Sequence, residues 1–292
     1  MSAAPSAPTR THTYHGEATV LKGDLYHPLV QQIKPQSNVK LADHGGYLSE
    51  HSEPYRLEGV IAFEKAYTQV AGNPNPKPEG GWTTLVTSVI EDLNVLEVVT
   101  ADRVIGQIAT VHPAQGYVPQ VHFLGTRFEN LRIDGRPVDV HFHRDHPYPM
   151  PDPVNDGPYT RHPGFLDRLK TQFESMRGST GVSDELLKRY SHLPSKSGTE
   201  DEGTSEESVE LSLVEKVDAP SFCRCHGHVI YLKDFGEIHL GVLKVHHSDY
   251  NKQKGLYKRT LFELTMIELK MGCVAGGMSA MGIAITNGQS SP

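Results

Sequence analysis

A short pattern occurs twice in this chain of 292 residues, each time at the end of an apolar, β-branched run. The first copy reads Glu64-Lys65-Ala66 and then Gln69-Val70, and the second reads Asp102-Arg103-Val104 and then Gln107-Ile108. The copies begin 38 positions apart, at residues 64 and 102. Similar segments at a fixed spacing indicate a repeated structural unit, and β-branched residues favour strands. We therefore predict matched strands of duplicated β-units rather than an active site.

The composition agrees with a turn-rich β protein. Its 27 Gly and 20 Pro residues predict many turns and few long helices. The 35 acidic and 28 basic residues give a formal net charge of −7. Since nucleic acids and anionic membranes attract basic surfaces, we expect no nucleic-acid partner and no membrane insertion.

The sequence shows neither an export signal nor a membrane segment. We expect residues 1–12 to form a flexible N-terminus, because Met1 to Arg10 are small residues and prolines without the apolar stretch of a signal peptide. Only three cysteines occur, so a disulfide framework is not expected. A cytoplasmic location is the default expectation, with export by a non-classical route left open.

Strand patterns fill two outer blocks, residues 13–146 and 209–288. An Asp134-Gly135 turn predicts a hairpin that leads into a strand over residues 138–143. Residues 261–271 are apolar on both faces of an alternating pattern, which favours a buried strand over a helix. The second block has too few strands for a core of its own, so we expect one discontinuous β-domain. The predicted fold is mainly β, as a sandwich, a barrel or a solenoid-like domain with a small helical insert.

The middle of the chain differs from both blocks. Prolines from residue 147 onward predict an extended connector, and apolar spacing from Phe165 to Phe173 and at Leu186, Leu187 and Tyr190 predicts two short amphipathic helices before residue 193. A capping pattern at Ser183 precedes the second helix. Residues 194–208 are acidic with little apolar content, so we predict a disordered linker there.

Several strand and turn segments carry a resemblance to known proteins. They are Leu41-Ala42-Asp43 with Gly45-Gly46, the run ending in Thr100-Ala101-Asp102, Phe123-Leu124-Gly125-Thr126 with residues 131–138, Phe235-Gly236-Glu237-Ile238, and Leu264-Thr265-Met266 through Gly272-Cys273. In these segments the chain resembles an uncharacterised family of bacterial β-proteins and, more distantly, is similar to the secreted choice-of-anchor P proteins. The resemblance implies a β fold and no catalytic residue. Because this chain shows no signal peptide or surface anchor, we do not expect extracellular display.

The sharpest candidate site among the 17 histidines is Asp139, His141 and His143. Side chains two residues apart share one face of a strand, so these three would project together. Two imidazoles and a carboxylate could hold Zn²⁺ or Fe²⁺ with positions open for substrate. The alternative interpretation is the solvated face of an amphipathic strand.

A second candidate metal cluster consists of Cys223, Cys225, His226 and His228. Its spacing matches neither a zinc knuckle nor a haem-attachment motif, so another element would have to complete the ligand set. The competing interpretation is that the cysteines pack as small apolar residues.

Common catalytic motifs are missing from the sequence, including a nucleophile elbow, a phosphate-binding loop and a His-Glu-x-x-His helix. This favours a non-catalytic β-scaffold that self-assembles into a homo-oligomer or binds a partner over an enzyme. The alternative is a metal-binding protein or metal-dependent enzyme built on Asp139, His141 and His143. A carbohydrate-binding module, with Trp82 as stacking platform, is a third hypothesis, although a single aromatic at such a position is more often a packing anchor.

Overall fold

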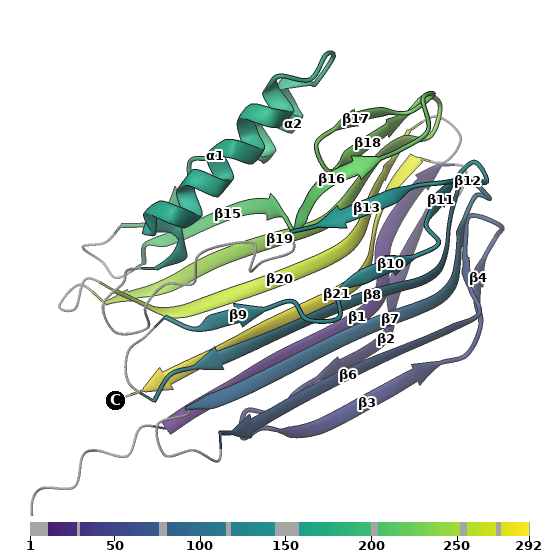
Figure 1. Ribbon diagram of the computed structural model, residues 1–292. Coiled ribbons are helices and arrows are strands. Elements are labelled where there is room, and N and C mark those ends of the chain that lie inside the picture. Colours follow the sequence, from purple (N-terminus) through teal and green to yellow (C-terminus); the bar gives the residue numbers. More distant parts are fainter. Residues whose placement is uncertain are drawn as a thin grey trace, which may run out of the picture.

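The computed structural model describes residues 11–27, 30–75, 81–114, 118–143, 158–199, 204–251, 256–272 and 276–291. These residues form a mainly β, sandwich-like fold with a small helical insert (Figure 1). Of the three architectures that the sequence allowed, the structure therefore has the sandwich. The part of the predicted proline-rich connector over residues 147–157 lies outside the described residues, as do residues 1–10 of the predicted flexible N-terminus. Thr11 and His12, which were predicted to belong to that N-terminus, are instead the first residues of strand β1.

The first sheet combines the beginning and the end of the chain. Its strands are, in order, β14 (Ser195–Ser197), β15 (Glu206–Ser212), β19 (Gly236–Asn251), β20 (Leu256–Met271), β21 (Gly276–Ser291), β1 (Thr11–His27) and β2 (Gln31–Lys40), with β17 (Arg224–His226) paired to β18 (Val229–Leu232) and β18 to β19. The antiparallel β1–β21 ladder runs from Thr11 opposite Ser291 to His27 opposite Gly276. This ladder joins the two outer sequence blocks.

The second sheet is built from the N-terminal block. Its main path is β12 (Arg136–Pro137), β11 (Arg132–Ile133), β8 (Val99–His112), β7 (Trp82–Val95), β5 (Ile61–Phe63) and β4 (Tyr55–Leu57). Strand β6 (Lys65–Pro74) pairs with β7 and β3 (Gly46–Ser52), while β9 (Gln120–His122) and β10 (Arg127–Glu129) pair with β8. The sheets pack face to face around one apolar core, to which both outer blocks contribute.

The repeated pattern occupies equivalent places on either side of β7. Its first copy lies in β6, apart from Glu64 just before the strand, and its second lies in β8; both strands run antiparallel to β7. Lys65 and Arg103 are both in register with Glu91, and Arg103 Nη2 donates to Glu91 Oε1 at 2.6 Å. The two copies are thus matched strands that share one central partner.

A bend crosses the first sheet where the buried positions change phase. In β20 the buried apolar side chains of residues 261–271 are Phe262, Leu264 and Met266 before the bend and Ile267, Leu269 and Met271 after it. Gly241 and Gly282, on the neighbouring strands, have φ values of 59° and 65° that favour glycine. The predicted buried strand over residues 261–271 is confirmed, and this change of face explains why it is apolar on both sides.

The Asp134-Gly135 turn joins β11 and β12, but this hairpin does not continue as predicted. Residues 139–142 form strand β13 (Asp139–Phe142), which leaves the hairpin and pairs with β16 (Val214–Asp218) in a separate two-stranded sheet. The backbone N–H and C=O groups of β13 need hydrogen-bond partners, and they find them on β16, which belongs to the C-terminal block.

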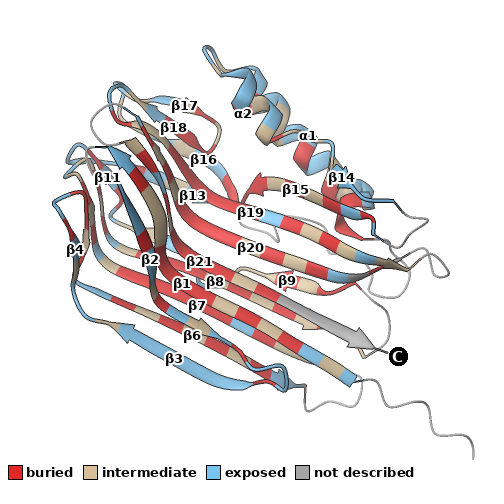
Figure 2. Ribbon diagram, turned by 180° about the vertical axis from the view of Figure 1, so that it is seen from behind, coloured by how far each residue is buried: buried red, intermediate tan, exposed pale blue. Residues whose placement is uncertain are grey.

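The two helices that the sequence predicted are present, and they cover the outer part of the first sheet (Figure 2). They are α1 (Pro163–Arg177), which follows the short 3₁₀-helix η1 (Tyr159–Arg161), and α2 (Asp184–Arg189). Ser183 caps α2, because its hydroxyl accepts from the amide of Leu186 at 3.2 Å. Phe165 and Leu169 of α1 join the main core.

The acidic stretch 194–208 is not a disordered linker in its described part. Residues 195–197 form β14 and residues 206–208 begin β15, and the two strands pair with each other. The carboxylate of Glu207 is buried, and it is held by Arg161 and Thr160 of η1. The low apolar content of this stretch indicated disorder. Composition could not show the stabilising contacts of Glu207, because its partners lie more than forty positions away in the chain.

Candidate functional site

The predicted metal trio on β13 does not assemble into one site. Nε2 of His141 lies 2.9 Å from Asp218 Oδ2, whereas Nδ1 of His143 lies 3.9 Å from Glu215 Oε2. The β13–β16 register shifts between His141 and Phe142, where Glu215 is an extra residue in β16. Strand β13 itself ends at Phe142, so His143 lies beyond the strand on which the prediction placed it. Across the described part of the chain, no three His, Cys, Asp or Glu side chains converge as a metal site requires.

The second predicted cluster also stays apart. Cys223 and Cys225 are partly exposed free thiols that pack against the core. Burial raises the pKa of Cys223 to about 11, and it raises the pKa of Cys225 as well. Among the described residues they belong to no group of three or more His, Cys, Asp or Glu side chains that could hold a metal ion. The packing interpretation therefore fits these cysteines better.

One cavity brings together residues from both predicted clusters. His143 and His228 line a cavity of about 160 Å³ between α1 and the strand β16. The other lining residues include Arg168, Thr171, Gln172 and Ser175 of α1, together with Val214, Glu215 and Gly227. The cavity lining therefore includes an arginine, a glutamate and two histidines.

Gln172 fixes α1 over this cavity. Its Nε2 donates to the carbonyl of Ser212 at 3.2 Å, and its Oε1 accepts from the amide of Ser212 at 2.9 Å. A side-chain amide that both donates to and accepts from one backbone residue leaves little freedom for its own rotation. The wall formed by α1 is thus held in a defined position against β15.

His228 is the most deeply buried residue of the cavity, with 1% of its surface exposed. Neither ring nitrogen has a hydrogen-bond partner among the described residues. The ring meets Tyr190 edge-on, with centroids 4.5 Å apart and planes at 88°. Burial, followed by the charges of His239 and Arg189, lowers the pKa of His228 well below its ordinary value, so the imidazole is neutral.

A second feature is strand β3 at the outer edge of the second sheet, which was not predicted from the sequence. All residues of β3 are exposed except Ser52, which is partly exposed, and the strand pairs only with β6 (Figures 1 and 2). The exposed fractions of Tyr47 and Leu48 are 61% and 46%. The sequence from Tyr47 to His51 has no alternation of apolar and polar residues that could have indicated this strand.

A family model, described as a domain of unknown function (DUF8256), matches residues 12–246 of the chain. The chain belongs to the DUF8256 family. No curated protein and no solved structure matches it. The similarity to choice-of-anchor P proteins stays a prediction.

The DUF8256 match ends within β19 and includes both features above. Strands β20 and β21 lie beyond it, although they stand between β19 and β1 in the first sheet. None of the described helices of this DUF8256 protein is both long and apolar enough to cross a membrane.

Trp82 is a packing residue in this DUF8256 protein rather than an open stacking platform. Its ring stacks on His12, with centroids 4.9 Å apart and planes at 8°, and it packs against the core. A ring covered in this way has no free face toward that side for a sugar. This contact is that of a packing anchor, the alternative that the sequence offered for Trp82.

Proposed function

We propose that this DUF8256 protein is a non-catalytic β-scaffold that self-assembles through the edge strand β3. The exposed edge of β3 is the observation that carries the proposal. A free strand edge presents a row of backbone donors and acceptors to which another strand can add. The occupant that we propose is β3 of a second copy.

The other long edge of the sandwich is protected against such pairing. Strand β2 carries Lys34, Pro35 and Lys40, and Ser37 within it has a φ of 45°. Lysine, proline and irregular backbone are the usual means of blocking an edge. The edge strands β4, β12 and β14 have only two or three residues each. Strand β3 has seven residues, none of them Lys or Pro.

The sequence of β3 also suits pairing with itself. An antiparallel two-fold pairing centred on Ser49 would place Tyr47 opposite His51 and Leu48 opposite Glu50 of the second copy. All seven residues would then pair, and no two like charges would meet. Centring the pair on Glu50 would instead bring two carboxylates together, which disfavours that register.

The two side-chain rows of β3 have different surroundings. Tyr47 accepts from Gln69 Nε2 at 3.1 Å, and His51 lies with its ring centroid 5.7 Å from that of Tyr67, so both extend over β6. Leu48 belongs to the other row and remains 46% exposed. A second copy of β3 would cover Leu48 and add a ladder of backbone hydrogen bonds. An interface this small is typical of a weak, concentration-dependent dimer.

Sedimentation velocity over a wide concentration range tests the proposal. We expect the wild type to shift from monomer to dimer as its concentration rises. Ser49→Lys and Ser49→Glu should each remain monomeric, because like charges then meet at the two-fold axis. An equimolar mixture of the two variants should recover the dimer, since opposite charges then face each other.

Gln31→Lys is the matched control, because it adds the same charge to an exposed position of the β2 edge. It should dimerise as the wild type does. A wild type that stays monomeric at every concentration would contradict the proposal. Equal loss of the dimer in Gln31→Lys and Ser49→Lys would place the contact elsewhere.

A further inference from the structure

A groove crosses the first sheet over the end of β1, the start of β21 and the adjoining parts of β2 and β20. Its volume of about 430 Å³ falls within the range of roughly 300–1,000 Å³ that is usual for small-molecule sites. From the side chains that line it, we infer a binding site for a neutral carbohydrate chain. None of the described lining residues belongs to β3, so this site is separate from the proposed dimer contact.

Tyr26 gives the groove an uncovered aromatic ring, with an exposed fraction of 61%. It is the extra residue of a β-bulge, since its neighbours in β1 are in register with two adjacent residues of β21, Gly277 and Gly276. A bulge re-aims a side chain, and the two glycines place no side chain of their own against the ring. Met278, which is 46% exposed, adds apolar surface to the lining. The C–H groups of a sugar ring can pack on such a surface.

Three polar side chains of the lining are available to bind hydroxyl groups. Lys22, Asp24 and Gln32 form no hydrogen bond or ion pair among the described residues. Asp24 is in register with Gln32, and Lys22 lies two positions before Asp24 on the same strand. A lysine donates, a carboxylate accepts and a side-chain amide does both. A hydroxyl group also donates and accepts, so sugar hydroxyls suit all three.

The charges of the lining favour a neutral ligand. Lys22 and Asp24 carry opposite charges, and among the described lining residues the only other charge is that of Glu268. The carboxylate of Glu268 is already paired with Arg189 at 2.6 and 2.7 Å. An anionic ligand would approach two carboxylates with a single lysine to compensate, and a cationic ligand would approach that lysine. Carbohydrate hydroxyls meet neither obstacle.

The floor of the groove favours a sugar over a peptide. Lys22 and Glu268 are both in register with Ala280, so they stand on either side of this small residue. Strands β1, β20 and β21 lie inside the sheet and pair on both edges, so their backbone groups are used by neighbouring strands. A peptide that adds to a sheet needs a free strand edge. A ligand here is instead held by side chains.

Isothermal titration calorimetry with neutral and charged oligosaccharides tests the inference. The neutral probes are cellohexaose, maltohexaose, mannohexaose and xylohexaose, and we expect at least one of them to bind with a stoichiometry of one. The hexamers of galacturonate and glucosamine carry negative and positive charges, and each should bind at least tenfold more weakly. Failure of all the neutral probes to bind would overturn the inference, as would equally tight binding of a charged probe.

Tyr26→Ala assigns the binding to this groove. Loss of the ring should weaken binding by about tenfold, whereas Tyr26→Phe keeps the ring face and should bind as the wild type does. Tyr47→Ala is the matched control, because Tyr47 is also 61% exposed but lies on β3. Both tyrosines are exposed, so the midpoint of chemical unfolding should change little. Unchanged affinity in Tyr26→Ala, or an equal loss in Tyr47→Ala, would contradict the site.

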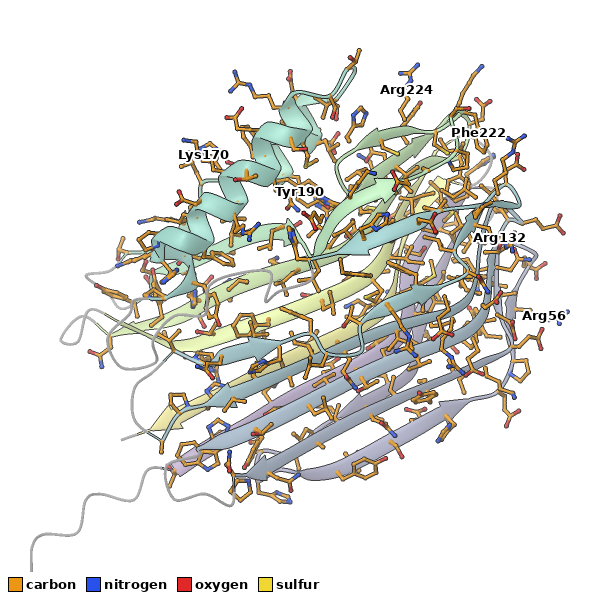
Figure 3. All side chains as sticks on the ribbon, in the orientation of Figure 1. Arg56, Arg132, Lys170, Tyr190, Phe222 and Arg224 are labelled. Atoms are coloured by element: carbon orange, nitrogen blue, oxygen red, sulfur yellow. The ribbon has the colours of Figure 1, made fainter. Side chains whose placement is uncertain are left out.

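Lys22→Ala tests the polar side of the groove. It should weaken sugar binding by about tenfold, because a hydrogen bond from a charged donor is lost. Lys170→Ala is its control, since Lys170 lies on α1 and outside the groove lining (Figure 3). Ser49→Lys, in which the proposed dimer is absent, should bind the sugar with unchanged affinity, so the two proposals can fail independently. Wild-type affinity in Lys22→Ala would contradict the site, as would loss of binding in Ser49→Lys.

Discussion

Arg189 and Glu268 form a two-point ion pair that fastens α2 to the first sheet. Nη1 and Nη2 of the guanidinium donate to Oε1 and Oε2 of the carboxylate at 2.6 and 2.7 Å. Nε of the same guanidinium donates to Glu210 Oε2 at 2.8 Å. One arginine thus links a helix to β15 and β20. Planar, two-point pairing is the geometry in which an arginine contributes most.

Removing Arg189 should destabilise the protein, because two carboxylates would lose their shared cation in a partly buried place. For Arg189→Ala we expect the free energy of unfolding to fall by about 2 kcal/mol. Arg56→Ala, which breaks an exposed pair with Glu64, should cost less than about 1 kcal/mol. Chemical unfolding in urea measures both variants. Equal losses would show that burial does not govern these pairs.

Glu207 should make stability fall in acid. Burial alone would raise the pKa of its carboxyl group, but hydrogen bonds from Arg161 and Thr160 outweigh burial and lower the pKa to about 2 from an ordinary value of 4.5. Because the pKa is lower in the folded state, this stability is present above about pH 4.5 and is lost as the pH falls toward 2. The full effect is on the order of 3 kcal/mol.

Glu207→Gln tests this pH dependence, since glutamine cannot titrate. Urea unfolding of both proteins between pH 6 and pH 2 should show a larger loss in the wild type than in the variant. Glu64→Gln is the control, because its exposed carboxylate should leave the profile almost unchanged. Parallel profiles for the wild type and Glu207→Gln would refute this role of Glu207.

Gly106 of β8, in the second sheet, allows a close approach to β20 and β21 of the first sheet at the bend. An added Cβ there would lie 2.7 Å from the carbonyl oxygen of Gly282 and 2.9 Å from Cγ of Met266. We expect Gly106→Ala to lower the free energy of unfolding by about 1–3 kcal/mol, the usual cost of overpacking. At Gly272 the nearest atom would be 3.9 Å away, so Gly272→Ala is the control. A neutral Gly106→Ala would show that the sheets can separate there without cost.

The region matched by the family model should not fold alone. A fragment of residues 12–246 lacks β20 and β21, so β1 would lose its ladder with β21 and β19 its ladder with β20. We expect this fragment to lack near-ultraviolet circular dichroism and a cooperative unfolding transition. Co-expression with residues 247–292 should restore both signals. Cooperative unfolding of the fragment alone would mean that its strands form a sufficient core by themselves.

Much of the local structure could be predicted from the sequence. The β-branched runs marked most long strands, Ser183 marked the start of α2, and the repeated pattern marked β6 and β8 as equivalent. These features depend on residues close together in the chain, where alternation, capping and turn formation act directly. The strand β3 was missed because its exposed residues carry little apolar signal.

The candidate site could be predicted only in part. His143 and His228 were both recognised as candidate site residues, but as members of two separate metal clusters. Nothing in a sequence shows that β13 ends before His143, or that His143 and His228 line one cavity beneath α1. The ion pairs of Arg189 and Glu207 were missed for the same reason, since their partners are distant in the chain.

The sequence by itself determined that the chain forms a β protein with repeated strands and a short helical insert, because alternation and turn residues act over a few neighbouring positions. Only the tertiary structure decided that β1 pairs with β21, that the acidic segment becomes a strand held by Arg161, and that histidines 85 positions apart share one cavity. Such contacts depend on how complete sheets stack and bend, and that is settled by the packing of the whole core rather than by any local segment.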